Sequence, residues 1–193
     1  MLKAELRKIY KEKRSQLSLA QKDKMNDLLL IQFQQLPIPI PEFVLTYDPI
    51  ERYNEVDPRL FIEFMEFRNP HLQVAYPVMY TQTDQNILKA ILVDEDTIFE
   101  TNAFGVAEPI NGTELEPTEI DLIISPLLCF DTKGNRVGYG KGYYDQLFVT
   151  CRKDCLKIGV SFFDPVESIN DVNEFDIPLD YCVTPERIYT FNQ

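Results

Sequence analysis

The sequence predicts one α/β domain with an open, mostly parallel sheet flanked by helices and preceded by two N-terminal helices. Three observations support this fold class. The chain has 193 residues, the usual length of one domain, and 45% of them are hydrophobic. Beyond residue 42, segments with strand and helix patterns alternate. Several strand segments are also continuous apolar runs, which is typical of parallel strands covered by helices on both faces.

The two N-terminal helices come first. Residues 2–17 place apolar side chains at helical spacing along one face. A second helix is predicted to begin after Ser18, since Gln21 three residues later completes a capping box, and to run through Leu36. The proline-rich residues 37–41 end this helix and form a stiff, extended connector.

The remaining elements follow from apolar runs and capping signals. Asp57 and Pro58 form a cap followed by a proline at the first helical position, so a helix is predicted from there through Phe67. The most apolar run, residues 122–130, is predicted as a single strand. The other predicted strands are 43–47, 73–80, 87–93, 155–163 and 181–184, and a last short helix is predicted over 143–150.

The charge distribution is uneven. The formal net charge is −12, which argues against a nucleic-acid-binding protein, yet residues 1–24 carry eight Lys or Arg and three Asp or Glu. Lys3, Arg7, Lys11 and Arg14 are spaced four, four and three residues apart, so they share one helical face. A solvated face and a phosphate-binding face are equally compatible with this pattern.

Other classes are disfavoured. No apolar run approaches the roughly 20 residues of a transmembrane helix, and the charged start does not resemble a signal peptide, so we expect a cytoplasmic protein without membrane association. The single histidine, His71, is expected on a surface loop and makes Ser–His or Cys–His catalysis improbable. The cysteines contain no CxxC pair and are expected to be reduced; they are Cys129, Cys151, Cys155 and Cys182.

The glycine-rich segment 131–145 is the strongest functional signal. Four of the seven glycines lie between residues 134 and 142, after the most apolar run and before a predicted helix. Such a loop exposes backbone amides to an anion, and Arg136 and Lys141 add positive charge for phosphate oxygens. Asp145 offers a carboxylate for Mg²⁺, and the neighbouring tyrosines offer flat faces for an aromatic ligand.

The spacing of this segment matches neither a Walker A loop nor the GxGxxG fingerprint. The alternative is a glycine-rich turn whose tyrosines pack beneath it. Weaker candidates lie elsewhere. Glu55 either orients a polar ligand or is solvated, and the irregular segment 104–109 is either a binding loop or an ordinary loop. In the acidic run 164–180, Asp176 or Asp180 is a candidate metal ligand.

Residues 126–145 and several flanking motifs together resemble the 5-formyltetrahydrofolate cyclo-ligase family, also called methenyltetrahydrofolate synthetases. The central match contains Phe130-Asp131, Gly134, Arg136, Gly138 and the run from Gly140 to Asp145. The flanking matches, in chain order, are Lys3-x3-Arg7, Glu55-Val56-Asp57, Phe104-Gly105, Glu108-Pro109, Asp176 to Asp180 and Thr184-Pro185.

The resemblance implies a single Rossmann-like domain over residues 1–193. It also implies an enzyme, expected to be monomeric, that converts 5-formyltetrahydrofolate to 5,10-methenyltetrahydrofolate with ATP and Mg²⁺. The implied ATP-binding residues are Lys3, Arg7, Gly134, Arg136, Gly138, Gly140, Lys141, Gly142, Tyr143 and Tyr144. The implied folate-binding residues are Ile50, Glu55, Phe104, Tyr139, Gly140, Lys141, Gly142 and Tyr143, and the implied magnesium ligands are Asp145 and Asp176.

Two positions depart from the family pattern. Gln146 stands where many relatives have arginine, and Phe175 stands where a polar residue is usual. The implied mechanism is a phosphoryl transfer to the formyl oxygen, in which Lys141 and Arg136 would act as catalytic cations that neutralise developing charge. The alternatives are another ATP-dependent ligase or phosphotransferase acting on a small acid, and a non-catalytic nucleotide- or folate-binding protein. An RNA-binding module is the weakest alternative.

Overall fold

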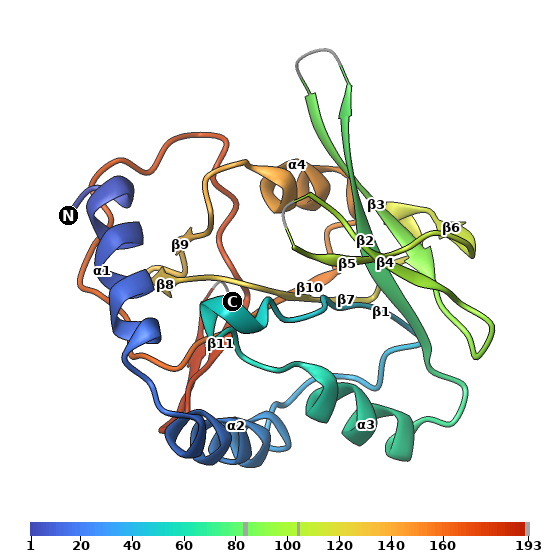
Figure 1. The fold of residues 1–193 in the computed structure, drawn as a ribbon, viewed down its shortest axis with the longest axis horizontal. Coiled ribbons are helices and arrows are strands. Elements are labelled where there is room, and N and C mark those ends of the chain that lie inside the picture. The colour runs from blue at the N-terminus through green and yellow to red at the C-terminus, as the bar shows by residue number, and fades with distance from the viewer. Residues whose placement is uncertain (83–84, 104, 192–193) are drawn as a thin grey trace.

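A computed structural model describes residues 1–82, 85–103 and 105–191. Its centre is an eight-stranded sheet with strand order β12-β11-β10-β7-β1-β2-β3-β6 (Figure 1). The helices are α1 (Lys3–Ser15), α2 (Leu19–Phe33), α3 (Arg59–Arg68) and α4 (Tyr143–Thr150), with short 3₁₀ turns η1 (Glu51–Tyr53) and η2 (Pro117–Glu119). The strands of this sheet are β1 (Phe43–Leu45), β2 (Gln73–Gln82), β3 (Gln85–Leu92), β6 (Thr113–Leu115), β7 (Leu122–Ser125), β10 (Leu156–Val160), β11 (Tyr181–Val183) and β12 (Ile188–Thr190).

The middle of the sheet is parallel, as predicted. Strands β11, β10, β7, β1 and β2 pair in parallel, whereas β12, β3 and β6 join antiparallel at the two edges. The β2–β3 pair is a long hairpin in which Ala75 lies opposite Leu92. A hairpin reverses the chain within a few residues, so its second strand must run antiparallel. The predicted α/β class is therefore confirmed, with antiparallel edges added.

Each face of the sheet has its own helices. Val44 packs in the core on the face covered by α2 and α3, while the next residue, Leu45, packs on the face covered by α4 (Figure 1). Successive side chains of a strand point to opposite faces, so a strand buried on both sides needs an unbroken apolar run. Leu45 and Ile123 are fully buried, and burying one such side chain contributes about 1.5–3 kcal/mol.

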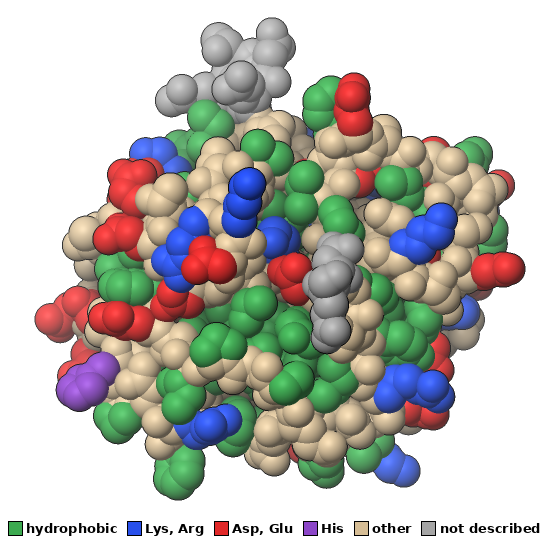
Figure 2. All heavy atoms as spheres, turned by 180° about the vertical axis from the view of Figure 1, so that it is seen from behind, with side chains coloured by type: hydrophobic (Ala, Val, Ile, Leu, Met, Phe, Trp, Pro, Cys, Tyr) green, Lys and Arg blue, Asp and Glu red, His purple; other side chains and the backbone are tan. Residues whose placement is uncertain are grey.

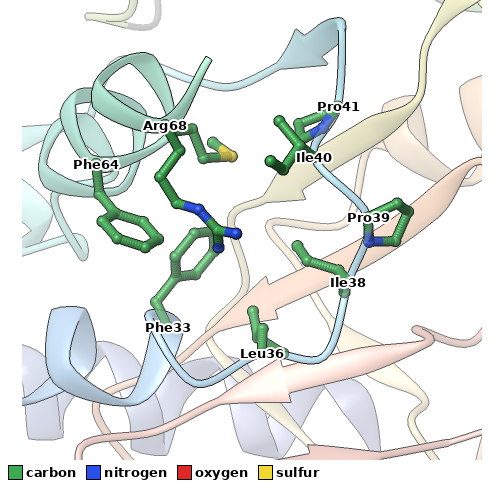
Figure 3. A pocket seen from close by; sticks show the side chains of 9 residues that line it. Phe33, Leu36, Ile38, Pro39, Ile40, Pro41, Phe64 and Arg68 are labelled. Carbon is green, nitrogen blue, oxygen red and sulfur yellow. The ribbon is translucent and has the colours of Figure 1, made fainter.

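The N-terminal helices begin where the sequence predicts. Ser18 caps α2, and the capping box with Gln21 is formed in both directions. Helix α2 ends at Phe33, three residues before the predicted end. The proline-rich connector then folds back toward α3, where Ile38, Ile40 and Arg68 line a small apolar cavity (Figure 3). Its volume is about 20 Å³, room for roughly one water molecule.

Two parts of the predicted element order are wrong, and two strands of the main sheet, β6 and β12, were not predicted. The run 122–130 is two strands, β7 and then β8 (Cys129–Phe130), because Pro126 has no N–H to continue the ladder. Strand β8 leaves the main sheet and pairs with β9 (Arg136–Val137). Within the segment predicted to be irregular, β5 (Ala107–Pro109) pairs with β4 (Phe99–Thr101).

The surface carries mixed charge. On the face seen in Figure 2, acidic and basic side chains are both present, and several basic side chains gather beside acidic ones in its upper middle. All four cysteines are free thiols, as predicted, and His71 is exposed. Among the described residues, no helix is long and apolar enough to span a bilayer.

Candidate active site

One large pocket brings most of the predicted site residues together. Its volume is about 690 Å³, within the range of small-molecule sites. Tyr47 and Asp48, which follow β1, and Pro126, which follows β7, line it. The pocket therefore lies beyond the carboxyl ends of parallel strands, where α/β sheets bind their ligands.

The β9–α4 loop, residues 138–142, forms one wall of this pocket. Gly140 and Gly142 have φ angles of 97° and 72°, which L side chains rarely adopt, and Gly142 is the N-cap of α4. A Cβ at Gly140 would also lie 3.0 Å from Cζ of Arg7, so that glycine serves close packing as well as backbone shape. Gly138 has no such constraint.

Helix α1 supplies cations to the same pocket. Arg7 donates from Nε to the Gly138 carbonyl at 2.9 Å, which ties the helix to the loop. Lys3 Nζ lies 2.6 Å from Oδ1 and 2.5 Å from Oδ2 of Asp176. Lys11 lines the pocket as well. Three of the four residues thus line a cavity and Arg14 is buried, while Lys3 also rests against the acidic Asp176, so the phosphate-binding role of this face stays a prediction.

Arg136 is held in place on several sides. Its NH2 pairs with Asp145 Oδ1 at 2.9 Å, its NH1 donates to the Ile177 carbonyl at 2.7 Å, and its guanidinium lies 4.4 Å from the centroid of the Phe148 ring. Burial lowers the pKa of Arg136, and the Asp145 charge opposes that shift. Arg136 therefore orders the start of α4 and presents its charge from a fixed position.

Lys141 has a different environment. It is exposed, and its ammonium makes no hydrogen bond or ion pair with the described residues. Its backbone carbonyl accepts a hydrogen bond of 2.8 Å from Asn86 Nδ2 on β3, which anchors the loop to the hairpin. The loop backbone at Lys141 is thus fixed, while the side chain is available to a ligand.

Glu55 is buried rather than solvated. Only 3% of it is exposed, and burial raises the pKa of its carboxyl group. Oε2 accepts from the Ile50 backbone N–H at 2.7 Å, and Oε1 accepts from the Tyr139 hydroxyl. A buried carboxylate costs free energy unless its oxygens are hydrogen-bonded, so these two donors stabilise a carboxylate beside the pocket.

Aromatic rings line the pocket near Glu55. The rings of Tyr53 and Tyr139 lie 5.7 Å apart between centroids, and Lys11 Nζ lies 5.4 Å from the Tyr139 centroid. Burial is the largest cause that raises the pKa of the Tyr139 hydroxyl, so this group remains a proton donor at neutral pH. Tyr139, Tyr143 and Tyr144 all line the cavity, and each also packs against a hydrophobic core cluster, so a ligand-contacting role of these tyrosines stays a prediction.

The two predicted magnesium ligands face the same pocket. Asp145 uses Oδ1 for both Arg136 and the Ile177 backbone N–H, while Asp176 binds Lys3 and the Asn173 backbone N–H. Within the described residues, no group of three or more acidic, histidine or cysteine side chains is arranged to hold a metal ion. Mg²⁺ needs only one or two carboxylates when substrate phosphates and water complete its shell, so the donor set fits that kind of site.

Two predicted residues do not line the pocket, and a third falls outside the described residues. Gly134 lies in the β8–β9 turn outside the pocket, where a Cβ would meet the Phe191 ring at 2.7 Å, so its glycine is explained by packing. Asp180 also lies outside the pocket and binds Lys157 on β10. Phe104 falls outside the described residues. The two departures from the family pattern, Gln146 and Phe175, both line the pocket.

Sequence reasoning missed several lining residues, among them Asp48, Arg52, Tyr53, Pro77 and Met79. The signal for the first three was their place between β1 and α3, beyond the end of a buried strand. Pro77 and Met79 lie within β2, where an ordinary strand pattern gives no sign that one side faces a ligand.

An α/β domain of this form, with cations, carboxylates and aromatic rings around one pocket at the strand ends, belongs to the class of domains that bind small molecules beyond the carboxyl ends of parallel strands. The model of the 5-formyltetrahydrofolate cyclo-ligase family matches residues 66–185. The chain belongs to that family.

Curated relatives and a solved structure support this family assignment. A 5-formyltetrahydrofolate cyclo-ligase from Mycoplasma pneumoniae is 29% identical over 191 residues, covering 96% of this chain and all of the relative. One from Haemophilus influenzae is 32% identical over 120 residues, which is 60% of this chain and 61% of the relative. The NMR structure of Aquifex aeolicus 5,10-methenyltetrahydrofolate synthetase superposes with a TM-score of 0.79 at 31% identity, covering 100% of this chain and 94% of that one. The predicted family, fold and enzyme class are confirmed.

Proposed function

We propose that this enzyme cyclises 5-formyltetrahydrofolate to 5,10-methenyltetrahydrofolate while converting ATP to ADP and phosphate. The observation that carries the proposal is the composition of one continuous pocket. A cation-bearing glycine loop lies at one part of its wall, and a buried carboxylate with aromatic rings lies at another. These two environments suit a triphosphate and a reduced pterin held side by side.

The triphosphate is assigned to the loop and to α1. Backbone amides of a glycine loop and cations at fixed positions complement phosphate oxygens. Lys3, Arg7 and Arg136 contribute charge from ordered positions, while Lys141 supplies a side chain with no partner among the described residues. Gly138, Gly140, Gly142, Tyr143 and Tyr144 complete the proposed ATP-binding set.

The folate is assigned to the part of the pocket around Glu55. A carboxylate oxygen accepts more than one hydrogen bond, so both oxygens of Glu55 retain capacity for N–H donors of a pterin ring. Ile50 and Tyr139 hold this carboxylate and also line the pocket. The loop residues Gly140 to Tyr143 would contact both substrates.

The proposed chemistry has two stages. The formyl oxygen attacks the γ-phosphorus of ATP, and the bond between this phosphorus and the β,γ-bridging oxygen breaks. ADP is released, and the folate becomes an imidate phosphate. N10 then attacks the activated carbon and loses its proton, and phosphate departs as the ring closes. The protein supplies positioning and charge stabilisation rather than a nucleophile, so the chain needs no Ser–His or Cys–His pair.

Asp145 and Asp176 are the residues that would hold Mg²⁺. A bound Mg²⁺ would neutralise charge on the phosphate oxygens. The chain's own contribution is to hold both carboxylates close to the cations that the triphosphate would meet. Within the described residues, both contacts of Asp145 use Oδ1, so its Oδ2 has no protein partner, whereas both oxygens of Asp176 are already bound.

A direct assay tests the proposal. Purified protein mixed with 5-formyltetrahydrofolate, ATP and Mg²⁺ should form the conjugated methenyl product, followed by its absorbance, with one ADP released for each turnover. EDTA added in excess of Mg²⁺ should stop product formation. ATP hydrolysis that does not respond to 5-formyltetrahydrofolate would instead favour another ligase or phosphotransferase, and ligand binding without product would favour a non-catalytic protein.

A further inference from the structure

Arg14 is a buried charge with no role in the chemistry described above. It lies in the last turn of α1 and is only 2% exposed. No carboxylate among the described residues forms an ion pair with it. A buried guanidinium is costly unless its donors are satisfied and a negative charge lies nearby, so its surroundings need an explanation.

The guanidinium connects to Glu55 through one tyrosine. Arg14 NH1 lies 3.5 Å from the Tyr139 hydroxyl oxygen, which in turn donates to Glu55 Oε1, while NH2 donates to the Leu127 carbonyl. Arginine has only donors, so the Tyr139 oxygen must accept from it and must direct its own proton to Glu55. The chain of hydrogen bonds therefore has one direction and ends on the Glu55 carboxyl group.

The backbone of Arg14 reaches the same carboxylate by a second route. Its carbonyl accepts a hydrogen bond of 2.8 Å from Asn54 Nδ2. Asn54 has a φ of 46°, a left-handed conformation that asparagine tolerates better than most residues, and it directly precedes Glu55. The end of α1 thus fixes both the turn that carries Glu55 and the hydroxyl that binds it.

We propose that Arg14 is a positioning residue, which acts through Tyr139 to hold Glu55 ionised and oriented for the folate. The inference rests on the proposed function, since it assigns a role within the folate side of that site. The buried Arg14 guanidinium lies one phenol away from the Glu55 carboxyl group, so its positive charge favours the ionised form of Glu55.

The charges around Glu55 set the expected pH dependence. Burial raises the pKa of Glu55, the contacts with Ile50 and Tyr139 lower it, Arg14 also lowers it, and Asp48 raises it. Tyr47 and Tyr144 also lie within electrostatic range but stay neutral, because burial raises the pKa of each hydroxyl. Loss of the Arg14 charge therefore raises the pKa of Glu55 further, and the ionised form is lost at a higher pH than in the wild type.

The test compares Arg14→Met, Arg14→Lys and Tyr139→Phe with the wild type. Lys8→Met is the matched control, because it removes an exposed positive charge from the same helix. The KM for 5-formyltetrahydrofolate and the KM for ATP are measured between about pH 5 and 8.5. We expect Arg14→Met to raise the folate KM roughly 10- to 100-fold near pH 6, the change expected for weakening a hydrogen bond to a charged group, and less at high pH. The ATP KM should stay within about twofold.

The other variants distinguish positioning from mere stability. Arg14→Lys keeps the charge and should restore most of the wild-type pH profile, although it cannot reproduce both guanidinium contacts. Tyr139→Phe should move the acid limb of the folate KM profile to higher pH. The double variant Arg14→Met/Tyr139→Phe should raise the folate KM by less than the product of the two single effects, since both changes break one chain and Arg14 keeps only its through-space charge effect on Glu55 in Tyr139→Phe.

Three outcomes would overturn the inference, and they are distinguishable. An active wild type whose Arg14→Met and Tyr139→Phe variants keep the wild-type pH profile and folate KM would refute the positioning role alone. Variants that lower kcat and raise both KM values equally at every pH would refute it as well, because such a loss is what general destabilisation produces. A wild type that forms no methenyl product would refute the proposed function and this inference together.

Discussion

Replacing Lys141 with alanine should lower kcat roughly 100- to 1000-fold, the range measured when one well-placed donor to a developing negative charge is removed. The reason is the position of this residue. Its backbone is anchored by Asn86 on β3, yet its ammonium has no partner among the described residues, so its charge is available to the transferred phosphoryl group. Because the side chain is exposed, its loss should leave the melting temperature within about 2 °C of the wild type.

Lys133→Ala is the matched control for this prediction. Lys133 is an exposed lysine of the same glycine-rich segment, but it lies in the β8–β9 turn and does not line the pocket. Its replacement should leave kcat and both KM values near those of the wild type. If Lys141→Ala turned over at a near-normal rate, or if the two variants lost activity equally, Lys141 would have no special role in the transition state.

Replacing Asp145 with alanine should destabilise the fold by about 3–5 kcal/mol, because it removes the partner of a buried charge. The side chain of Arg136 is 5% exposed and pairs with Asp145 at 2.9 Å. For a chain of this length, such a loss corresponds to a fall in melting temperature of roughly 6–20 °C. Activity should also be lost, since the same carboxylate is a proposed magnesium ligand.

Asp154→Ala provides the comparison. Asp154 pairs with Arg152 at the same distance, 2.9 Å, but its side chain is 79% exposed, and Arg152 also pairs with Asp121. Surface ion pairs contribute about 0–1 kcal/mol, so this variant should melt close to the wild type. Thermal unfolding followed by circular dichroism measures both variants, and equal melting temperatures would mean that Asp145 is not needed to compensate Arg136.

Most of the fold could be predicted because its signals are local. The capping box of Ser18 and Gln21 and the proline-rich connector each act within a few residues, and the boundaries they set were nearly correct. The break at Pro126 was visible in the sequence but was outweighed by the apolar run around it. The antiparallel edges were missed because β6 and β12 were not predicted as strands and because the short connection between β2 and β3 was not interpreted as a hairpin.

The residues of the candidate site also fall into two groups, those with a local sequence signal and those without one. Lys141 and Gly140 were found because the loop concentrates glycines and cations in one short segment. The burial of Glu55 and Arg14 was not visible, because a lone carboxylate and one position of a basic helical face have the same sequence pattern when solvated. Their environment arises where α1, η1 and the β9–α4 loop meet, and only the tertiary structure brings these segments together.

The central claim is that the Gly138–Gly142 loop binds the triphosphate of ATP beside the folate side of the same pocket. A crystal structure of the protein with a non-hydrolysable ATP analogue and Mg²⁺ tests it most directly. We expect phosphate density against the loop amides and within reach of Lys3, Arg7 and Lys141, with Glu55 left open to the second substrate. Phosphates found elsewhere, with the loop tyrosines filling the pocket, would contradict it.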